Sequence, residues 1–474
     1  MSFKRVSALL LTAAMVTSMA ACGGKGNNSG QSDSGTKGET KGTESVKDTD
    51  ASDGEIGTLI DGKKVNLIGT EDPIELTLWD IATEDPTKST QEGAVQRFMA
   101  DYPNVTVTQI HTQNDAYKEK LAIAMSSGQC PDMYIHWLGG PMYEYIDSGF
   151  AQPIDDIFDE VNKVKFIESA MAQTKYNDKM YAIPFGGLSG SGIYYNKNIL
   201  AAHGYDEFPE TISELEELCD ALVADGITPF SLANGSKWTG SMYFMYLAAR
   251  AGGVDAANEA LKGEGGFMAE PYIYAATTIQ DWVKKGYFPE GVNSLSTDDG
   301  QDRQLMYTGE AAMMLHGTWQ SSSMKTDSPE WYEENIDFAP FPKLEGSDAD
   351  QTVVVGTAAG NGFSFNCEGD KLRAGVVLAT NYFNDDQYNA DQIEANKIPS
   401  IEGMDANITD EIQLKVWDMF FSASDVQLWY DQNLPPVVGE KHKDLMQDLF
   451  GLHMTPEQIC QAHEDAIEEY NASK

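Results

Sequence analysis

Strands and helices alternate along residues 74–137, and this alternation restricts the fold more than any other feature of the chain. The segment "IELTLWD" (residues 74–80) alternates apolar and polar side chains as a half-buried strand does. A helical pattern follows, and the same plan then repeats with strands at 105–110 and 133–137. Such an alternation indicates an α/β fold with a largely parallel sheet.

The length of the chain, 474 residues, indicates two packed lobes, because a single small core does not grow to that size. Ligands of open α/β sheets bind beyond the carboxyl ends of the strands. Trp79, Asp80 and Trp137 lie at such ends. The alternation therefore indicates both the fold class and the edge of the sheet where a ligand binds.

Two later helices are marked by their own capping residues. Residues 211–226 begin with Thr211 and carry Glu214 three positions on, which is a capping box. A second box, Thr455 with Gln458, opens the C-terminal helix. The expected buried stripe of the first helix is Leu215, Leu218, Leu222 and Val223.

Residues 1–21 have the organisation of a signal peptide. Lys4 and Arg5 precede an apolar stretch that is shorter than the roughly 20 residues of a membrane span. The stretch ends in "SMAAC", which resembles the lipobox of bacterial lipoproteins, so we expect cleavage before Cys22 and lipidation of that cysteine. An ordinary secretory signal with a coincidental cysteine is the alternative.

We predict that residues 22–70 are the lipidated cysteine and a flexible tether. Residues 23–55 contain no aromatic side chain and are nearly all Gly, Ser, Thr, Asn, Asp, Lys and Glu, a composition that cannot bury enough apolar area to order itself. Such a tether spans roughly 30 Å. The expected location is the membrane, with lipid anchoring on the extracytoplasmic face.

The charge balance excludes one class of partner. The chain has 32 Lys and Arg against 74 Asp and Glu, a net charge of −42. Nucleic acids and anionic lipid surfaces attract basic faces, so nucleic acid is not an expected partner. The excess of acid gives solubility and self-repulsion.

No sequence motif for catalysis or metal binding is present. The chain has no P-loop, no nucleophile elbow and no zinc-protease helix motif, and its histidines show no ligand spacing. No C-x-x-C occurs; Cys130, Cys219, Cys367 and Cys460 could pair as two disulfides, but free thiols are favoured. We therefore expect a binding protein, with no cofactor and no metal, and not an enzyme.

Aromatic side chains near predicted loops suggest the chemistry of the ligand. A sugar ring has an apolar face and a rim of hydroxyls, which a flat aromatic ring with nearby polar side chains matches. In "GEAAMMLHGTWQS", residues 311–315 read as a buried strand, and Gly317 and Thr318 then place Trp319 at the end of that strand. A position in the core or between lobes stays open for each candidate ring: Trp79, Trp137, Trp238, Trp319, Trp429 and Tyr430.

Five segments, in this order, resemble one family. They are "ELTLWD", "YAIPFGG…IYYNKNIL", "TISELEELCDALVADGITPFSLANGSKWTG", "YTGEAAMMLHGTW" and "TPEQICQAHEDAIEEY", and they cover most of residues 71–470. The chain resembles the extracellular solute-binding proteins of carbohydrate ABC importers in their Gram-positive lipoprotein form. The resemblance implies a periplasmic-binding-protein-like fold with two interleaved lobes and a ligand cleft between them.

The resemblance also implies an organisation and a mechanism. The first lobe would hold residues 71–184 plus 345–403, and the second lobe residues 185–344 plus 404–474, with chain crossings near Pro184, Pro340–Pro342 and Pro399–Gly403. The lobes would close around a sugar, expected to be an oligosaccharide, and a membrane permease would recognise the closed form. The expected state is a monomer.

The positions of these segments nominate the binding residues. Trp238 and Trp319 are the stacking candidates, and Trp429 and Asn433 precede an "LPP" segment that borders the cleft in relatives. The first lobe would add two loops, whose expected contact residues are Asp80, Thr83, Asp132 and Trp137. "LWDIATEDPTK" matches no sugar-specific subgroup, so the identity of the sugar stays open.

Two other functions remain possible at the level of sequence. One is a tethered, secreted carbohydrate-active enzyme. The other is a binding protein for a different solute, such as a peptide or a polyamine. A glycosidase would release product from an oligosaccharide, whereas a binding protein would not, and a sugar bound near so many tryptophans should change their emission.

Overall fold

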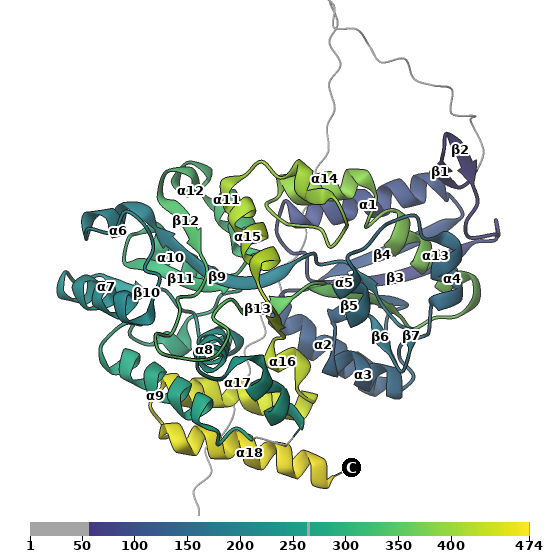
Figure 1. Ribbon diagram of the computed structural model, residues 1–474. Helices are drawn as coiled ribbons and strands as arrows, with labels where there is room; N and C mark the ends of the chain where they lie inside the picture. Colours follow the sequence, from purple (N-terminus) through teal and green to yellow (C-terminus); the bar gives the residue numbers. More distant parts are fainter. Residues whose placement is uncertain (1–55, 263–265, 474) are drawn as a thin grey trace, which may run out of the picture. The chain divides into compact units, whose positions relative to one another are not determined.

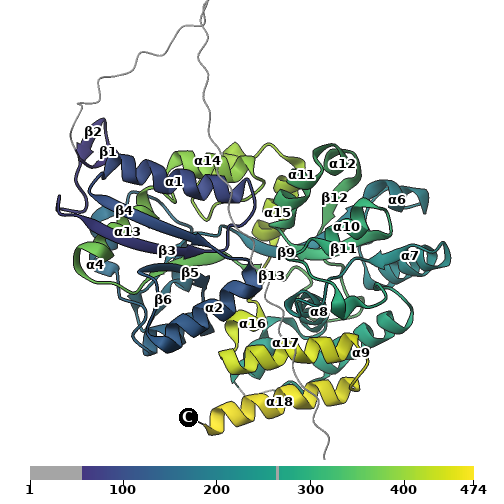
Figure 2. The same ribbon diagram turned by 180° about the vertical axis from the view of Figure 1, so that it is seen from behind.

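The computed structural model describes residues 56–262 and 266–473, and it contains two large sheets (Figures 1 and 2). We call each sheet with its surrounding helices a lobe, the first lobe being the one that contains residues 74–80. The predicted signal peptide, Cys22 and the part of the predicted tether up to residue 55 lie outside the described residues. Within the described chain no helix combines the length and the hydropathy that a membrane span requires.

The first sheet confirms the predicted α/β plan. Its strands, in spatial order, are β4 (Val105–His111), β3 (Ile74–Asp80), β5 (Met133–Trp137), β14 (Asn361–Phe365) and β8 (Ile183–Pro184). Strand β3 runs parallel to β4 and β5, while β14 is antiparallel to both of its neighbours. The strand predicted at 105–110 extends by one residue, to His111.

Helices pack around this sheet. In Figures 1 and 2 helices α1 and α14 run along one side of it, and α2 and α3 lie on the opposite side. The helices of this lobe are α1 (Thr87–Asp101), α2 (Asn114–Ser127), α3 (Gly140–Asp147), α4 (Asp155–Val161), α5 (Glu168–Gln173), α13 (Gly369–Asn381) and α14 (Asp386–Glu394). A small hairpin, β6 (Lys175–Tyr176) with β7 (Lys179–Met180), completes the lobe.

The second sheet is mixed. Its strands, in order, are β10 (Thr228–Phe230), β11 (Ala311–Gly317), β9 (Ser189–Asn196), β13 (Val354–Thr357) and β15 (Val426–Gln427), and β12 (Ile336–Ala339) also pairs with β9. All seven residues of β11 are buried, because the sheet is covered on both faces.

Most helices of the described chain belong to the second lobe. Figures 1 and 2 show α17 and α18 together beneath α8. The helices are α6 (Lys197–Ala202), α7 (Ile212–Ala224), α8 (Trp238–Lys262), α9 (Glu270–Lys284), α10 (Gln301–Tyr307), α11 (Gln320–Asp327), α12 (Pro329–Asn335), α15 (Glu411–Ser422), α16 (Tyr430–Asn433), α17 (Pro436–Phe450) and α18 (Pro456–Ala472), with short 3-10 turns at Val292–Ser294 and Met404–Asn407.

The lobes are interleaved, because the chain passes between the two sheets three times. The first passage is at residues 185–188 and the second at 358–360, between β13 and β14. The third follows Ile401, which still bridges to Phe166 of the first lobe. The second passage differs from the sequence expectation, which assigned residues 345–357 to the first lobe.

Arg250 explains this difference. Its buried guanidinium donates hydrogen bonds to the carbonyl oxygens of Phe341, Pro342 and Val353, each at 2.9 Å. These bonds hold the segment with its prolines against the second lobe, and β13 then pairs with β9 of the second sheet. The chain leaves its strand at these prolines but stays in the second lobe.

Residues 56–70, which the sequence predicts to be part of the tether, are folded. Residues 56–70 are ordered: β1 (Thr58–Ile60) pairs with β2 (Lys63–Val65), and Leu67 and Ile68 are buried in the first core. The Thr58 hydroxyl lies 3.0 Å from the Tyr102 hydroxyl. This segment packs because it carries six Ile, Leu and Val side chains, and two of them lie in the core.

Both capping boxes are present at the expected residues, Thr211 with Glu214 and Thr455 with Gln458. The stripe of α7 is buried at Leu215, Leu218 and Leu222, but Val223 is 37 % exposed, so its inclusion was wrong. The four cysteines of the described chain, Cys130, Cys219, Cys367 and Cys460, are free thiols.

Candidate functional site

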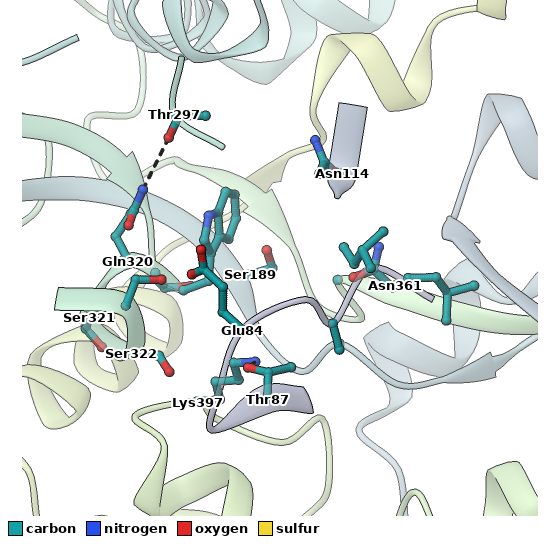
Figure 3. A pocket seen from close by; sticks show the side chains of 18 of the residues that line it. Glu84, Thr87, Asn114, Ser189, Thr297, Gln320, Ser321, Ser322, Asn361 and Lys397 are labelled. Atoms are coloured by element: carbon teal, nitrogen blue, oxygen red, sulfur yellow. Dashed lines mark hydrogen bonds between the residues drawn. The ribbon is translucent and has the colours of Figure 1, made fainter. Parts of the chain in front are cut away.

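A pocket of about 310 Å³ lies between the two sheets and is lined from both lobes (Figure 3). The first lobe contributes the loop after β3, the start of α2 and the end of β5. The second lobe contributes the start of α8, the loop after β11 with the first turn of α11, and α16. The segments where the chain passes between lobes line it too, through Ser189, Asn361 and Lys397 among others. The volume is in the range of small-molecule sites.

Three tryptophans form the second-lobe wall of the pocket. The ring centroid of Trp319 lies 6.0 Å from that of Trp238 and 6.1 Å from that of Trp429. Trp238 and Trp319 are partly exposed, and each stands at the first turn of a helix. The Trp319 ring covers Gly317, where a Cβ atom would lie only 2.1 Å from Cη2 of that ring. The glycine at the end of β11 is therefore what lets the ring lie flat.

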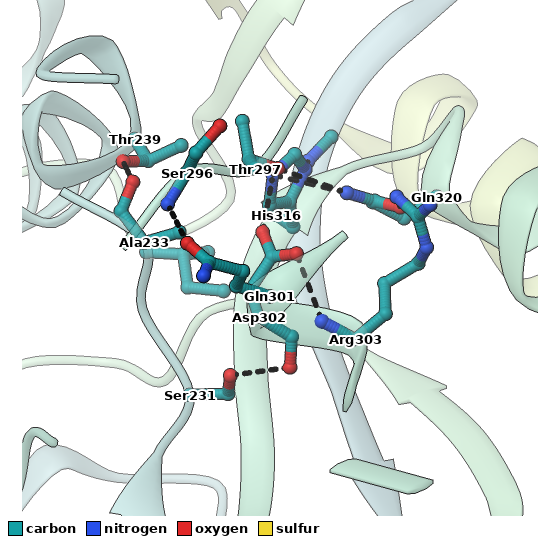
Figure 4. A network of polar contacts seen from close by, with 12 residues as sticks. Ser231, Ala233, Thr239, Ser296, Thr297, Gln301, Asp302, Arg303, His316 and Gln320 are labelled. Atoms are coloured by element: carbon teal, nitrogen blue, oxygen red, sulfur yellow. Dashed lines mark hydrogen bonds and ion pairs between the residues drawn. The ribbon is translucent and has the colours of Figure 1, made fainter. Parts of the chain in front are cut away.

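A buried polar network supports these rings from below (Figure 4). The His316 ring meets Trp238 and Trp319 edge-on, at centroid distances of 5.4 and 5.7 Å. Gly317 N–H donates to His316 Nδ1 at 2.8 Å, so the proton of the neutral ring is on Nε2. His316 Nε2 lies 3.2 Å from Thr297 Oγ1 and 3.5 Å from Asp302 Oδ2.

The network is neutral at its histidine. Burial lowers the pKa of His316 to about 3, because the charged imidazolium would lose its hydration, and the positive charge of Arg303 adds to the effect. Arg303 itself donates to Asp327 Oδ2 at 2.8 Å and to Gln320 Oε1 at 3.3 Å. The ring orientation is thus fixed by hydrogen bonds, with no titration at neutral pH.

The loop after β3 is held by Asp80. Its carboxylate accepts hydrogen bonds from Ala82 N–H at 2.8 Å and from the Gln109 amide at 2.8 Å, and it pairs with His111 Nδ1 at 2.6 Å. Burial raises the pKa of Asp80, against the lowering effect of these partners. The residue is fully buried and does not line the pocket. Its function is to position the loop that carries Thr83.

Trp137 forms part of the first-lobe wall, and Lys118 lies over its ring. The Lys118 ammonium is 4.4 Å from the ring centroid, within the range of a cation–π contact. Burial lowers the pKa of Lys118, while Asp431 and Asp115 act in the opposite direction. One face of the Trp137 ring is therefore covered by the protein's own cation.

Four buried polar atoms of the pocket residues have no hydrogen-bond partner within the described chain. They are Gln91 Oε1, Trp238 Nε1, Asn361 Nδ2 and Gln392 Nε2. Buried polar groups in proteins are nearly always paired, and each unpaired one costs about 1–3 kcal/mol. Donors and acceptors left open around aromatic rings are what a ligand with several hydroxyl groups would satisfy.

Five of the eight residues nominated from sequence line the pocket, and three do not. Those that line it are Thr83, Trp137, Trp238, Trp319 and Trp429. Those outside the lining are Asp80, Asp132 and Asn433.

Asp132 precedes β5 and so lies at the amino end of that strand, away from the pocket. Its carboxylate accepts hydrogen bonds from Thr77 N–H and the Thr77 hydroxyl at 2.9 and 3.0 Å, and it pairs with Lys371 at 3.2 Å. Asn433 ends α16, where the backbone packs against Gly139, so its neighbours Asp431 and Gln432 line the pocket instead.

Most of the polar lining of the pocket was not predicted from the sequence. Gln91, Lys118, Asn361, Gln392 and Lys397 lie in helices or at the passages between lobes, and nothing in their local sequence distinguishes them from surface residues. The serines at 321–323 are different, since they follow Trp319 directly and line the same pocket. Their place in a helical first turn beside a stacking candidate was a usable signal.

Comparison with known proteins identifies the family. The model of the bacterial extracellular solute-binding proteins matches residues 82–389. The chain belongs to this family. An ABC transporter extracellular-binding protein of Pyrococcus horikoshii, itself uncharacterized, is 27 % identical over 277 residues, and the maltodextrin-binding protein of Bacillus subtilis is 25 % identical over 294 residues. These alignments cover 58 % and 60 % of this chain and 61 % of each relative, less than two thirds of their length.

Solved structures of this solute-binding fold superpose over nearly their whole length. A protein from a study of xylan utilization by Caldanaerobius polysaccharolyticus matches with a TM-score of 0.76 at 26 % identity, covering 82 % of this chain and 99 % of that one. A chitin oligosaccharide binding protein gives a TM-score of 0.77 at 24 % identity, covering 85 % and 100 %. The two-lobe fold expected from sequence is confirmed, and the relatives are binding proteins.

Proposed function

We propose that this solute-binding protein captures an oligosaccharide outside the cell and delivers it to the permease of an ABC transporter. The observation that carries the proposal is the convergence of three tryptophan rings and four unpaired polar atoms on one pocket between two lobes. Aromatic faces match the C–H faces of sugar rings, and the open donors and acceptors match their hydroxyls. The Bacillus subtilis relative is a maltodextrin-binding protein, which supports the same class of ligand.

The proposed contact residues are those of the earlier prediction that line the pocket. Trp238 and Trp319 stack on sugar rings, Trp429 and Trp137 form the walls, and Thr83 hydrogen-bonds to a hydroxyl. The protein acts as a monomer, without a cofactor, and changes no bond of the ligand.

Lobe closure couples binding to delivery. Asp115 N–H of the first lobe donates to Asp298 of the second at 3.2 Å, and Arg303 lies 4.0 Å from Glu84 across the pocket. A ligand that contacts both walls favours the closed arrangement by the contacts that it makes there and not in the open one. The three passages of the chain between lobes are where such a motion bends.

The location follows from the N-terminal residues. Lipidation of Cys22 and a tether up to about residue 55 hold the folded body close to the outer face of the membrane, within reach of a permease. Cys22→Ser in the full chain tests this: the variant should appear in the medium while the wild type stays with the membrane fraction. Equal distribution of both would refute the anchor.

One incubation separates the proposed function from its alternatives. The full chain is mixed with a panel of oligosaccharides while tryptophan emission is recorded, and the sugars are then analysed for cleavage. A binding protein changes its emission and returns the sugar intact. Release of product indicates an enzyme, and an unchanged emission and melting temperature with every saccharide refutes sugar binding.

A further inference from the structure

Three groups with positive electrostatic character meet in one corner of the pocket. Figure 3 shows Ser321, Ser322, Thr87 and Lys397 gathered there. The Lys397 ammonium donates to Thr87 Oγ1 at 2.5 Å, and Thr87 is the first residue of α1. The Ser321 hydroxyl donates to the carbonyl oxygen of Asn396, next to the lysine, at 3.3 Å. The corner therefore combines the amino ends of α1 and α11 with an ammonium group.

Lys397 differs from the other cations that line the pocket. Arg303 is paired with Asp327 at 2.8 Å, and Lys118 lies near Asp431 and Asp115. Within the described chain Lys397 has a hydroxyl as its hydrogen-bond partner and takes part in no ion pair. Its pKa falls to about 8, and burial is the sole cause, with no carboxylate to offset it.

The amino end of α11 is open towards the same corner. Its cap residue is Trp319, whose side chain makes no capping hydrogen bond, and its first turn carries Gln320, Ser321 and Ser322. The first N–H groups of a helix lack intrahelical partners and carry partial positive charge, which favours an anion. A cation placed at such an end, as Lys397 is at α1, is unfavourable unless an anion joins it.

A second, independent observation points to a ligand at this corner. Gln392 is only 6 % exposed and lines the pocket, and its Nε2 has no hydrogen-bond partner within the described chain. Its backbone carbonyl accepts from Lys397 N–H at 2.8 Å, so both residues belong to one local structure. The buried amide donor of Gln392 lines the same pocket as Lys397, and it lacks an acceptor.

We infer that the ligand is an acidic saccharide, a sugar that carries a carboxylate, and that this carboxylate binds between Lys397, the first turn of α11 and the Gln392 amide. A singly charged carboxylate fits better than a phosphate dianion, because the corner holds one unpaired cation. The inference rests on the proposed function, since it names the class of sugar that the pocket takes. The aromatic wall would stack on the remaining rings.

The test uses pairs of oligosaccharides that differ in one group. Galactose oligomers are compared with galacturonate oligomers, and glucose disaccharides with their glucuronate counterparts, by calorimetric titration of the full chain. The wild type should bind the carboxylate member roughly tenfold tighter or more, since charge-assisted hydrogen bonds are the strong ones. The difference should shrink at high salt for the carboxylate member alone.

Variants assign the effect to Lys397. Lys397→Met should bring the affinity for the acidic member down to that for the neutral one, and Lys397→Arg should keep most of the preference. Lys371→Met, which removes a half-exposed lysine paired with Asp132 outside the pocket, is the control and should leave the preference unchanged. Without ligand, Lys397→Met should melt no lower than the wild type, because it removes a desolvated charge that no anion compensates.

The outcomes separate the two claims. Equal or tighter binding of the neutral member by the wild type overturns the acidic ligand and leaves sugar binding intact. A preference that survives in Lys397→Met overturns the role of this corner. A ligand-free Lys397→Met that melts several degrees lower marks the lysine as structural and overturns the inference. Binding of neither member of any pair, with no response to other saccharides, overturns the proposed function together with the inference.

Discussion

Gly317→Ala should push the Trp319 ring out of its place in the pocket. A Cβ at position 317 would lie 2.1, 2.2 and 2.3 Å from Cη2, Cζ3 and Cζ2 of that ring. Carbon atoms in contact keep about 3.5 Å or more apart, so the ring must move by about 1.4 Å or the strand must shift. Gly317 has an ordinary extended backbone, so the effect comes from the added methyl group and not from backbone strain.

The direction in which the Trp319 ring moves determines whether ligand affinity changes. Behind the ring lie β11 and the buried His316, which cannot give way, so the ring moves towards the pocket and occupies part of the space of the ligand. Overpacking of this kind costs typically 1–3 kcal/mol. If that cost falls on binding, Kd rises about 5- to 150-fold.

Calorimetric titration with a saccharide that the wild type binds gives the affinity, and tryptophan emission reports the displaced ring. Gly93→Ala is the matched control, because a Cβ there meets only Arg97 Nη1 at 3.8 Å. It lies within α1 and should keep the wild-type Kd while gaining up to about 1 kcal/mol of stability. If Gly317→Ala binds within twofold of the wild type with unchanged emission, the ring does not form part of the binding surface.

Three further predictions follow from the same structure. Trp319→Ala should weaken saccharide binding at least roughly tenfold while shifting the melting temperature by only a few degrees, because the ring is partly exposed; Trp282→Ala, at a fully buried ring, should instead lose about 3–5 kcal/mol of stability and keep the affinity of the folded protein. Thr211→Ala should cost about 1 kcal/mol in urea unfolding through loss of the capping box of α7. Burial lowers the pKa of His136 from 6.5 to about 4, so below pH 6.5 the unfolded chain binds a proton at this residue before the folded protein does, and the free energy of unfolding falls by about 2 kcal/mol by pH 5. His136→Gln should therefore lose about that much less stability than the wild type between pH 7 and pH 5. An equal loss in both proteins would contradict the assignment.

The fold was accessible from the sequence because periodicity records burial. In the strand at Ile74–Asp80 and in the capped helix α7, the spacing of apolar residues predicts which side chains are buried. The position of the passage between β13 and β14 cannot be predicted in this way, because it depends on the buried Arg250, which holds Phe341–Pro342 against the second lobe. A long-range contact of this kind leaves no local pattern, and the crossing that the family resemblance implied near Pro340–Pro342 was in the wrong place.

Part of the binding site could also be predicted from the sequence, where local features mark its residues. Trp238 and Trp319 were found because large aromatics at the edges of loops are unusual and because the family resemblance nominated them. The rule that ligands bind at the carboxyl ends of strands found Trp137, and the resemblance nominated Thr83. The resemblance was misleading for Asp132, which stands at the amino end of β5. Polar residues such as Gln392 become pocket residues only through the arrangement of both lobes.

The position of a bound saccharide, determined by crystallography of the complex, tests the central claim most directly. We expect sugar rings against Trp238 and Trp319, with hydroxyls or a carboxylate within hydrogen-bond distance of Trp238 Nε1, Asn361 Nδ2 and Gln392 Nε2. A saccharide bound elsewhere on the protein, with these three atoms still unpaired, would contradict the account.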